Sequence, residues 1–166
     1  GSPAPISALS SFSPEYEKRR RDCKIPAEIQ FATKGDIALE LLHRQQQRGI
    51  LEARWVGCDS CFGVEAAFRE ELSAMGRTYL AAIKPESVLW VGDRSIEVYR
   101  LARERRIRWK QVLLAEGAKG PIAAEVARLR VRDNRGGEPG IEQWLLLRRL
   151  SDGRLKYYLS NASARV

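Results

Sequence analysis

Residues 33–83 restrict the fold most, because the spacing of their apolar residues changes from helical to strand-like and back. Thr33 is a candidate N-cap, with Asp36 three residues later in the first turn of a helix. Since two strands joined by a crossover helix lie parallel in one sheet, this segment predicts an α/β unit. The expected elements are a helix over 33–49, a buried strand over 54–58, a helix over 64–75 and a strand over 78–83.

The second half changes character after Pro85, where short strand-like runs follow one another between turn signals. The segment 134–140 and the pair Asp152-Gly153 are typical of hairpin turns. This half therefore predicts an antiparallel sheet attached to the α/β unit. The strand-like runs are 88–91, 96–99, 108–114, 123–131, 143–149 and 156–160.

Three regions are expected along the chain. Residues 1–32 form a Ser- and Pro-rich lead-in loop and a short charged helix that begins at Pro14. Residues 33–84 hold the α/β unit, and residues 85–166 form the strand-rich region. Because the chain starts with the tag-like pair Gly1-Ser2 and not with Met, we expect a piece of a longer protein.

The net charge favours a polyanionic partner. Lys and Arg number 29 against 21 Asp and Glu, which gives +8, and Arg outnumbers Lys, as suits bidentate phosphate contacts. The alternative is that the charge serves solubility alone. No apolar run approaches the roughly 20 residues of a membrane span, and residues 1–5 do not have the pattern of a signal peptide, so we expect no membrane partner. Three cysteines without a framework spacing favour a reducing cytoplasm.

Asp59 is the sharpest candidate for chemistry. It directly follows the strand expected over 54–58, and the loop 60–63 leads into a helix. Ligands of α/β sheets bind at the carboxyl ends of the strands, where a carboxylate can hold a hard cation. The alternative is that Asp59 only caps the helix that follows.

Basic residues gather in two places. The first patch surrounds Tyr99 and Trp109, and the second follows a strand in which alternate residues share a face. Both suit salt-sensitive contacts with DNA phosphates. The alternative is a solvated surface paired with Glu97, Glu104 and Glu125. The candidates for DNA binding are Arg100, Arg103, Arg105, Arg106, Arg108 and Lys110 in the first patch, Arg128, Arg130 and Arg132 in the second, and Lys119 between them.

Two other motifs carry less weight. Cys58 and Cys61 have CxxC spacing, but zinc needs two more ligands, and the candidates Cys23 and His43 do not have the usual spacing. We expect Cys58 to be a buried strand residue. Lys119 lies between glycines but lacks the pattern of a phosphate-binding loop.

An ordered set of short motifs runs through nearly the whole chain, although no single one is specific. The motifs are 16–26, 31–34, 37–42, 55–63, 68–72, 76–83, 117–121, 144–147 and 157–161. Their order resembles the central part of bacterial insertion-sequence transposases of the DDE superfamily.

The resemblance implies a ribonuclease-H-like core that cleaves DNA and transfers strands with Mg²⁺ or Mn²⁺. In that family one Asp lies on an early strand, a second follows a central strand, and a Glu lies on a late helix, often after a strand-rich insertion. Asp59 matches the second Asp through the Asp-Ser-x-aromatic-Gly context of 59–63, and 84–160 match the insertion. Phe62 stands where Tyr is usual, which removes a hydroxyl but keeps the ring.

The other two carboxylates have no counterpart in the sequence. No strand before Thr33 carries an Asp, and no helix after the β-rich region carries a Glu. Because phosphodiester cleavage of this kind uses two cations roughly 3.5 to 4 Å apart, a single Asp does not organise the pair. We therefore expect weak magnesium binding and no DNA cleavage by this chain alone.

Two other functions remain open on the sequence. One is a non-catalytic nucleic-acid-binding domain that uses the basic sheet, and the other is a pure interaction domain. A homo-oligomer is a further expectation, because the missing strands leave a sheet edge that a partner chain would cover.

Overall fold

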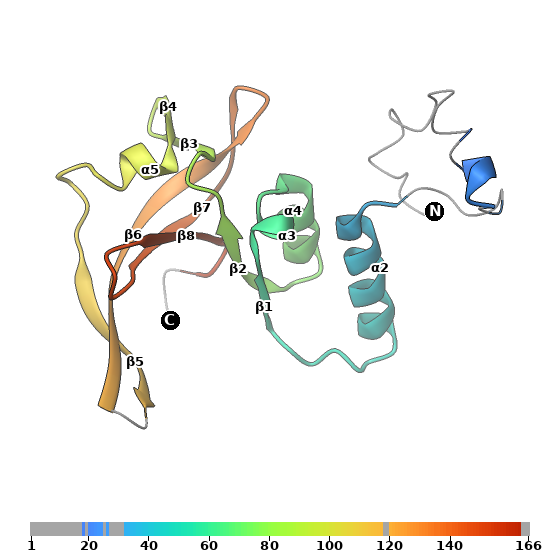
Figure 1. The fold of residues 1–166 in the computed structure, drawn as a ribbon, viewed down its shortest axis with the longest axis horizontal. Helices are drawn as coiled ribbons and strands as arrows, with labels where there is room; N and C mark the ends of the chain where they lie inside the picture. The colour runs from blue at the N-terminus through green and yellow to red at the C-terminus, as the bar shows by residue number, and fades with distance from the viewer. Residues whose placement is uncertain (1–17, 19, 25, 27–31, 118–119, 164–166) are drawn as a thin grey trace.

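The structure is a computed structural model that describes residues 18, 20–24, 26, 32–117 and 120–163. Its eight strands form one sheet in the order β1-β2-β8-β7-β6-β3-β4, and β5 pairs with β6 (Figure 1). The elements are α2 (Lys34–Gln47), β1 (Trp55–Cys58), α3 (Ser60–Gly63), α4 (Ala66–Ala74), β2 (Thr78–Ile83), β3 (Val88–Val91), β4 (Arg94–Glu97), α5 (Val98–Leu101), β5 (Lys110–Gly117), β6 (Gly120–Arg135), β7 (Glu138–Arg149) and β8 (Leu155–Ser160).

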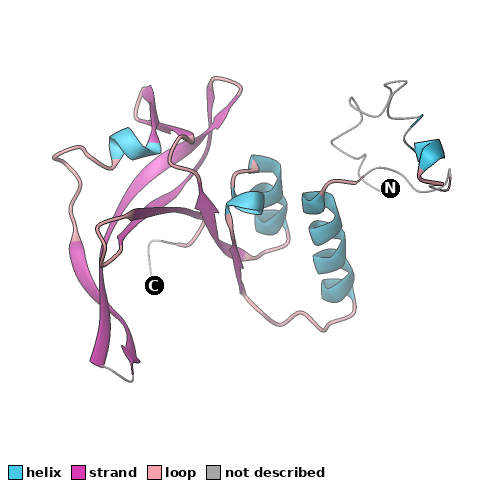
Figure 2. Cartoon of the chain, in the orientation of Figure 1, coloured by secondary structure: helices cyan, strands magenta, loops and turns pink. Residues whose placement is uncertain are grey.

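The mixed α/β architecture confirms the predicted fold class. Strands β1 and β2 are parallel, and every other strand pair is antiparallel. Helices α2, α3 and α4 lie beside β1 and β2, while the long strands β6 and β7 dominate the opposite part of the molecule (Figure 2). The partial ribonuclease-H-like unit is thus followed by an antiparallel, strand-rich region.

Helix α2 begins where the sequence predicts. The Asp36 amide donates to the Thr33 hydroxyl at 3.1 Å, and the Thr33 amide donates to the Asp36 carboxylate at 2.9 Å. This reciprocal capping box satisfies two amides that the first turn leaves unpaired. The helix ends just before Gly49, whose φ of 68° is a left-handed conformation that favours glycine.

The crossover between the parallel strands differs from the loop over 60–63 and the single helix over 64–75 that the sequence predicts. Asp59 caps the short helix α3, and Glu65 is extended with ψ of 113°, so α4 begins only at Ala66. Gly63 ends α3 against β2, where a Cβ would lie 2.1 Å from the carbonyl oxygen of Ala82. Only glycine therefore allows this close approach.

The sequence predicts that strand β1 is buried, but it is partly exposed. Its residues alternate between exposed and half-buried, and Trp55 is 51% exposed. The reason is its place at the edge of the sheet, where β2 is its only partner strand among the described residues. Cys58, expected to be buried, is half-buried for the same reason.

The strand-rich region confirms most of the expected strands and both hairpins. The turn between β6 and β7 uses Gly136 and Gly137 at positive φ, and the turn between β7 and β8 uses Gly153. The strand expected over 96–99 is wrong, because β4 stops at Glu97 and α5 follows. Val98 and Leu101 are fully buried three residues apart, which is helical spacing, and this burial outweighs the β-propensity of Val98 and Tyr99.

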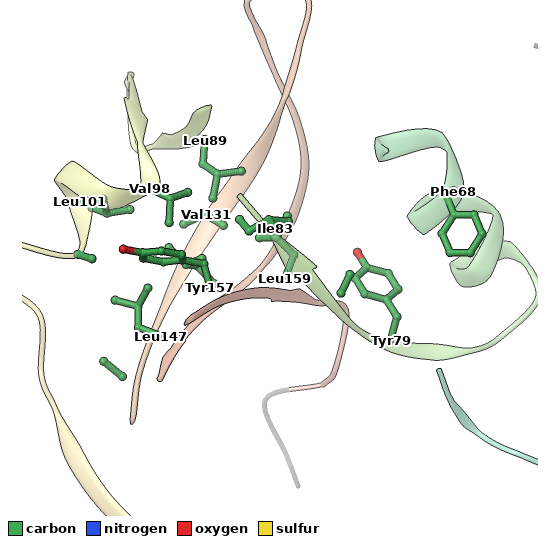
Figure 3. Close-up of a cluster of buried hydrophobic side chains, with 14 of the residues drawn as sticks. Phe68, Tyr79, Ile83, Leu89, Val98, Leu101, Val131, Leu147, Tyr157 and Leu159 are labelled. Atoms are coloured by element: carbon green, nitrogen blue, oxygen red, sulfur yellow. The ribbon is translucent and has the colours of Figure 1, made fainter. Parts of the chain in front are cut away.

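One hydrophobic core joins the two halves. In Figure 3, Tyr79 and Phe68 lie at one end, Ile83 and Leu159 in the middle, and the side chains from α5, β6 and β7 at the other end. Strand β2 makes this continuity, because it pairs with β1 on one side and with β8 on the other. The regions expected over 33–84 and 85–166 therefore share a sheet and a core.

The lead-in lies mostly outside the described residues. Of the charged helix expected after Pro14, residues 18 and 20–22 are described, and they are helical. None of the described helices is both long enough and apolar enough to cross a bilayer.

Replacing Gly63 with alanine tests the close approach of α3 to β2. The clash with the β2 backbone is expected to lower the free energy of unfolding by about 2 kcal/mol or more. Gly57→Ala is the matched control, because a Cβ there has no neighbour within 4 Å. Chemical denaturation of both variants measures the difference, and equal stabilities would contradict this packing.

Candidate metal and nucleic-acid sites

Asp59 lies where the sequence places it, directly after β1. Its side chain is exposed, and its Oδ1 accepts a hydrogen bond from the Cys61 amide at 2.8 Å. Its carbonyl oxygen accepts from the Gly63 amide at 2.7 Å. The capping role is therefore real, but it uses one carboxylate oxygen, and Oδ2 has no hydrogen bond from the residues described.

A groove of about 540 Å³ runs beside Asp59 between α2, β1 and the start of the crossover. Its lining is apolar apart from Asp59, Gln45 and the backbone. Half-exposed Leu41 lies on its α2 side. The lining residues are Ala38, Leu41, Leu42, Gln45, Val56, Gly57, Cys58, Asp59, Phe62 and Phe68.

The residues at this position fit part of a magnesium site. A free carboxylate oxygen is the ligand type that Mg²⁺ and Mn²⁺ prefer. Within the described part of the chain, however, no three His, Cys, Asp or Glu side chains come together. Asp59 thus offers one ligand, and a complete site needs further carboxylates.

The zinc interpretation of the cysteines gains no support. Cys61 is exposed, and burial raises the pKa of the Cys58 thiol, partly offset by the nearby Arg69 charge. His43 is half-exposed, and its Nε2 lies 2.8 Å from Oε1 of Glu71. The described cysteines and histidine form no metal-binding group.

A buried polar network that was not predicted from the sequence lies next to the turn with Asp59. Arg69 of α4 is 2% exposed, and its guanidinium bonds to the carbonyl oxygen of Gly63 and to Asp133 of β6. Nearby, the Tyr79 hydroxyl donates to Oε1 of buried Gln143 at 2.7 Å. One signal was present in the sequence: Asp133 continues the alternation of Ala127 and Val131 onto the buried face of β6.

The second basic patch lies on the outer face of β6, and its alternation is confirmed. Arg128, Arg130 and Arg132 are exposed, whereas the intervening residues point inward. Arg128 and Arg130 lie over the Trp144 ring, with their guanidinium carbons 4.9 and 4.7 Å from its centroid. Arg130 also pairs with Glu142 at 2.7 Å.

The first basic patch is partly neutralised. Arg100 pairs with Glu97 at 2.7 Å and Arg106 with Glu104 at 2.6 Å, as the solvated-surface alternative predicts. Arg103 lies over the Tyr99 ring, 5.9 Å from its centroid. The side chains of Arg105, Arg108 and Lys110 are exposed. Lys119 lies outside the described residues.

Helix α5 and the arginine row of β6 lie on opposite faces of the sheet. Helix α5 packs through Val98 and Leu101 into the core that contains Val131 and Tyr157, which is the inward face of β6 and β8. Arg128, Arg130 and Arg132 point to the other side. Lys110 pairs with Val126, two residues before Arg128, and so lies on the same face as Arg128, Arg130 and Arg132. The first patch is therefore divided between the two faces.

Comparison with protein families decides the chain's affiliation. A family described as DDE superfamily endonuclease matches residues 3–133. The chain belongs to the DDE superfamily endonucleases. No curated protein sequence matches it. The match to the DDE family includes the α/β unit, Asp59 and most of β6, and it leaves out the motifs at 144–147 and 157–161.

The pKa of Tyr79 gives a test of the buried network in this DDE domain. Burial raises it from 10.0 to about 12, against the opposing influence of the Arg69 charge. Because the folded pKa exceeds the unfolded one, burying the neutral phenol stabilises the fold fully below pH 10. That contribution is lost as pH rises toward about 12.

Tyr79→Phe should remove the last tyrosine to ionise in an alkaline absorbance titration. It should also lower stability at neutral pH by about 1 to 2 kcal/mol, because Gln143 loses its buried donor. Tyr158→Phe is the control, since Tyr158 is only half-buried. A titration curve that keeps its final step in Tyr79→Phe would contradict the assignment.

Proposed function

We propose that this chain is the central part of a DNA transposase in which Asp59 is one of the carboxylates that hold two divalent cations. The observation that carries the proposal is a free carboxylate oxygen at the carboxyl end of a parallel strand in a DDE superfamily endonuclease. Mg²⁺ or Mn²⁺ is the expected cation, because carboxylate oxygen is a hard ligand. When bound, such a pair activates the attacking oxygen and stabilises the leaving oxygen of a phosphodiester.

Several residues of this chain would have roles around the cations. Asp59 would orient a cation through Oδ2, while the Cys61 amide keeps Oδ1 in place. The carboxylates that complete the set would come from other segments of the protein, and the exposed edge of β1 is a suitable place for a strand that carries one of them. Phe62 keeps an aromatic ring beside the groove, in contact with Phe68.

The DNA-binding role falls first to the outer face of β6. Arg128 and Arg132 are exposed there without a carboxylate partner among the described ion pairs, and Trp144 holds Arg128 and Arg130 side by side. Arg103, Arg105 and Arg108 are further candidates, and Lys110 lies on the same face of the sheet as the arginine row of β6. The proposed set is completed by Lys119, Arg100 and Arg106. For Arg100 and Arg106, a DNA phosphate would have to replace the carboxylate partner, Glu97 or Glu104.

A non-catalytic nucleic-acid-binding domain is the second candidate function, and the same basic face of β6 favours it. The coding sequence on either side distinguishes the two. A strand with an Asp upstream and a helix with a Glu downstream support the transposase. The absence of both supports the binding domain. A homo-oligomeric assembly and the division of the chain at residue 84 are parts of the same proposal.

The chain alone should not cut DNA, because its described residues provide no complete cation site. Supercoiled plasmid incubated with the chain and Mg²⁺ or Mn²⁺ should stay intact, and the Asp59→Ala protein should give the same result. Nicking that depends on the divalent ion and disappears in Asp59→Ala would contradict the proposed division of the site.

Binding of duplex DNA should weaken steeply with salt. Arg128→Gln/Arg132→Gln should lower the slope of log affinity against log salt by about 2, since each lost phosphate contact removes about 0.9. Arg94→Gln/Arg154→Gln is the control of equal charge, because these arginines pair with Glu104 and Asp152. Equal slopes in the two double variants would show that net charge alone, not this face, holds DNA.

A further inference from the structure

Arg69 connects the turn that carries Asp59 to the strand-rich region. It lies on α4 and is 2% exposed. One terminal nitrogen, Nη1, donates to the carbonyl oxygen of Gly63, and the other, Nη2, pairs with Oδ2 of Asp133. A guanidinium suits this arrangement, because its planar fork reaches two acceptors in fixed directions.

The Gly63 end of this contact is part of the Asp59 turn. The Gly63 amide donates to the Asp59 carbonyl oxygen at 2.7 Å, and the Cys61 amide donates to Asp59 Oδ1 at 2.8 Å. Gly63 also lies directly on the β2 backbone at Ala82. Arg69 and β2 thus hold the turn from two sides.

The local structure around Asp133 also favours its contact with Arg69. The register between β6 and β7 shifts between Arg132 and Asn134, so Asp133 occupies a bulge, a feature that redirects a side chain. Its Oδ1 accepts from the Asn134 amide at 3.2 Å, which leaves Oδ2 for Arg69. Gly140 on β7 leaves room there, since a Cβ would lie 3.2 Å from Asp133 Cβ.

We infer that Arg69 is a positioning residue for Asp59, and that Asp133 sets the position of Arg69. This inference rests on the proposed role of Asp59 as a cation ligand. A buried ion pair contributes little net stability compared with apolar residues of similar size, so stability alone does not explain the pair. Through the Arg69–Asp133 pair, the strand-rich region fixes the position of Asp59, which comes earlier in the chain.

The test uses a variant that removes both charges and keeps the packing. Arg69→Met/Asp133→Leu should stay folded, because apolar replacements of a buried pair are tolerated. Glu70→Leu/Arg135→Met is the matched control, since this neighbouring ion pair also joins α4 to β6 but does not contact the turn. Arg69→Lys is the second variant, which keeps the charge but offers no fork for two acceptors.

Amide hydrogen exchange at Cys61 and Gly63 is the first readout. Both amides should exchange about tenfold faster or more in Arg69→Met/Asp133→Leu, because their local opening becomes easier, and should keep the wild-type rate in the control. In Arg69→Lys the exchange rates of both amides should lie between those of the double variant and the control. This variant also tests the inference if Arg69→Met/Asp133→Leu does not fold. Wild-type rates at both amides in Arg69→Met/Asp133→Leu or Arg69→Lys would overturn the inference.

Broadening of backbone amide NMR signals by Mn²⁺ is the second readout. In the wild-type chain, Mn²⁺ should broaden the signals of Ser60 and Cys61, and Asp59→Asn should abolish the effect. Arg69→Met/Asp133→Leu should weaken it several-fold. Unchanged broadening in that variant would overturn the positioning role alone. No broadening in the wild type would overturn the cation role of Asp59, and the positioning role with it.

Discussion

The two-sided pairing of β2 is the constraint on which the rest of the structure depends. Its parallel edge receives β1, which ends at Asp59, and its antiparallel edge receives β8 near the end of the described chain. The polar contacts between α4 or β2 and the long strands lie along the same junction, through Arg69 with Asp133 and Tyr79 with Gln143. The location of one carboxylate therefore depends on residues from both halves of the molecule.

Local chemistry explains which elements the sequence predicted well. The capping box of Thr33 and Asp36, the hairpin at Gly153 and the parallel pair of β1 and β2 depend on near neighbours or on a short crossover. The same holds for Asp59, whose position follows from the strand before it and the turn after it. Its capping bond uses one carboxylate oxygen and leaves the other free, so capping does not exclude the cation role proposed for this residue.

Long-range packing explains what the sequence did not reveal. Strand β1 is apolar but lies at an edge, and residues 98–101 form a helix because the core on the inner face of β6 receives them. Arg69 resembles any charged residue of an amphipathic helix until Asp133 is brought to it from 64 positions away. The residues of the first basic patch are divided between the two faces of the sheet, whereas periodicity predicts a single face for the arginine row of β6.

Mapping the cation with iron tests the central claim most directly. Fe²⁺ bound in place of Mg²⁺ reduces added hydrogen peroxide to hydroxyl radicals, and ascorbate returns the Fe³⁺ formed to Fe²⁺. The radicals cut the polypeptide next to the metal, and mass spectrometry identifies the cut positions. The account predicts cuts within residues 57–64 that excess Mg²⁺ suppresses and that Asp59→Asn removes. Cuts that lie elsewhere, or that persist in Asp59→Asn, would contradict it.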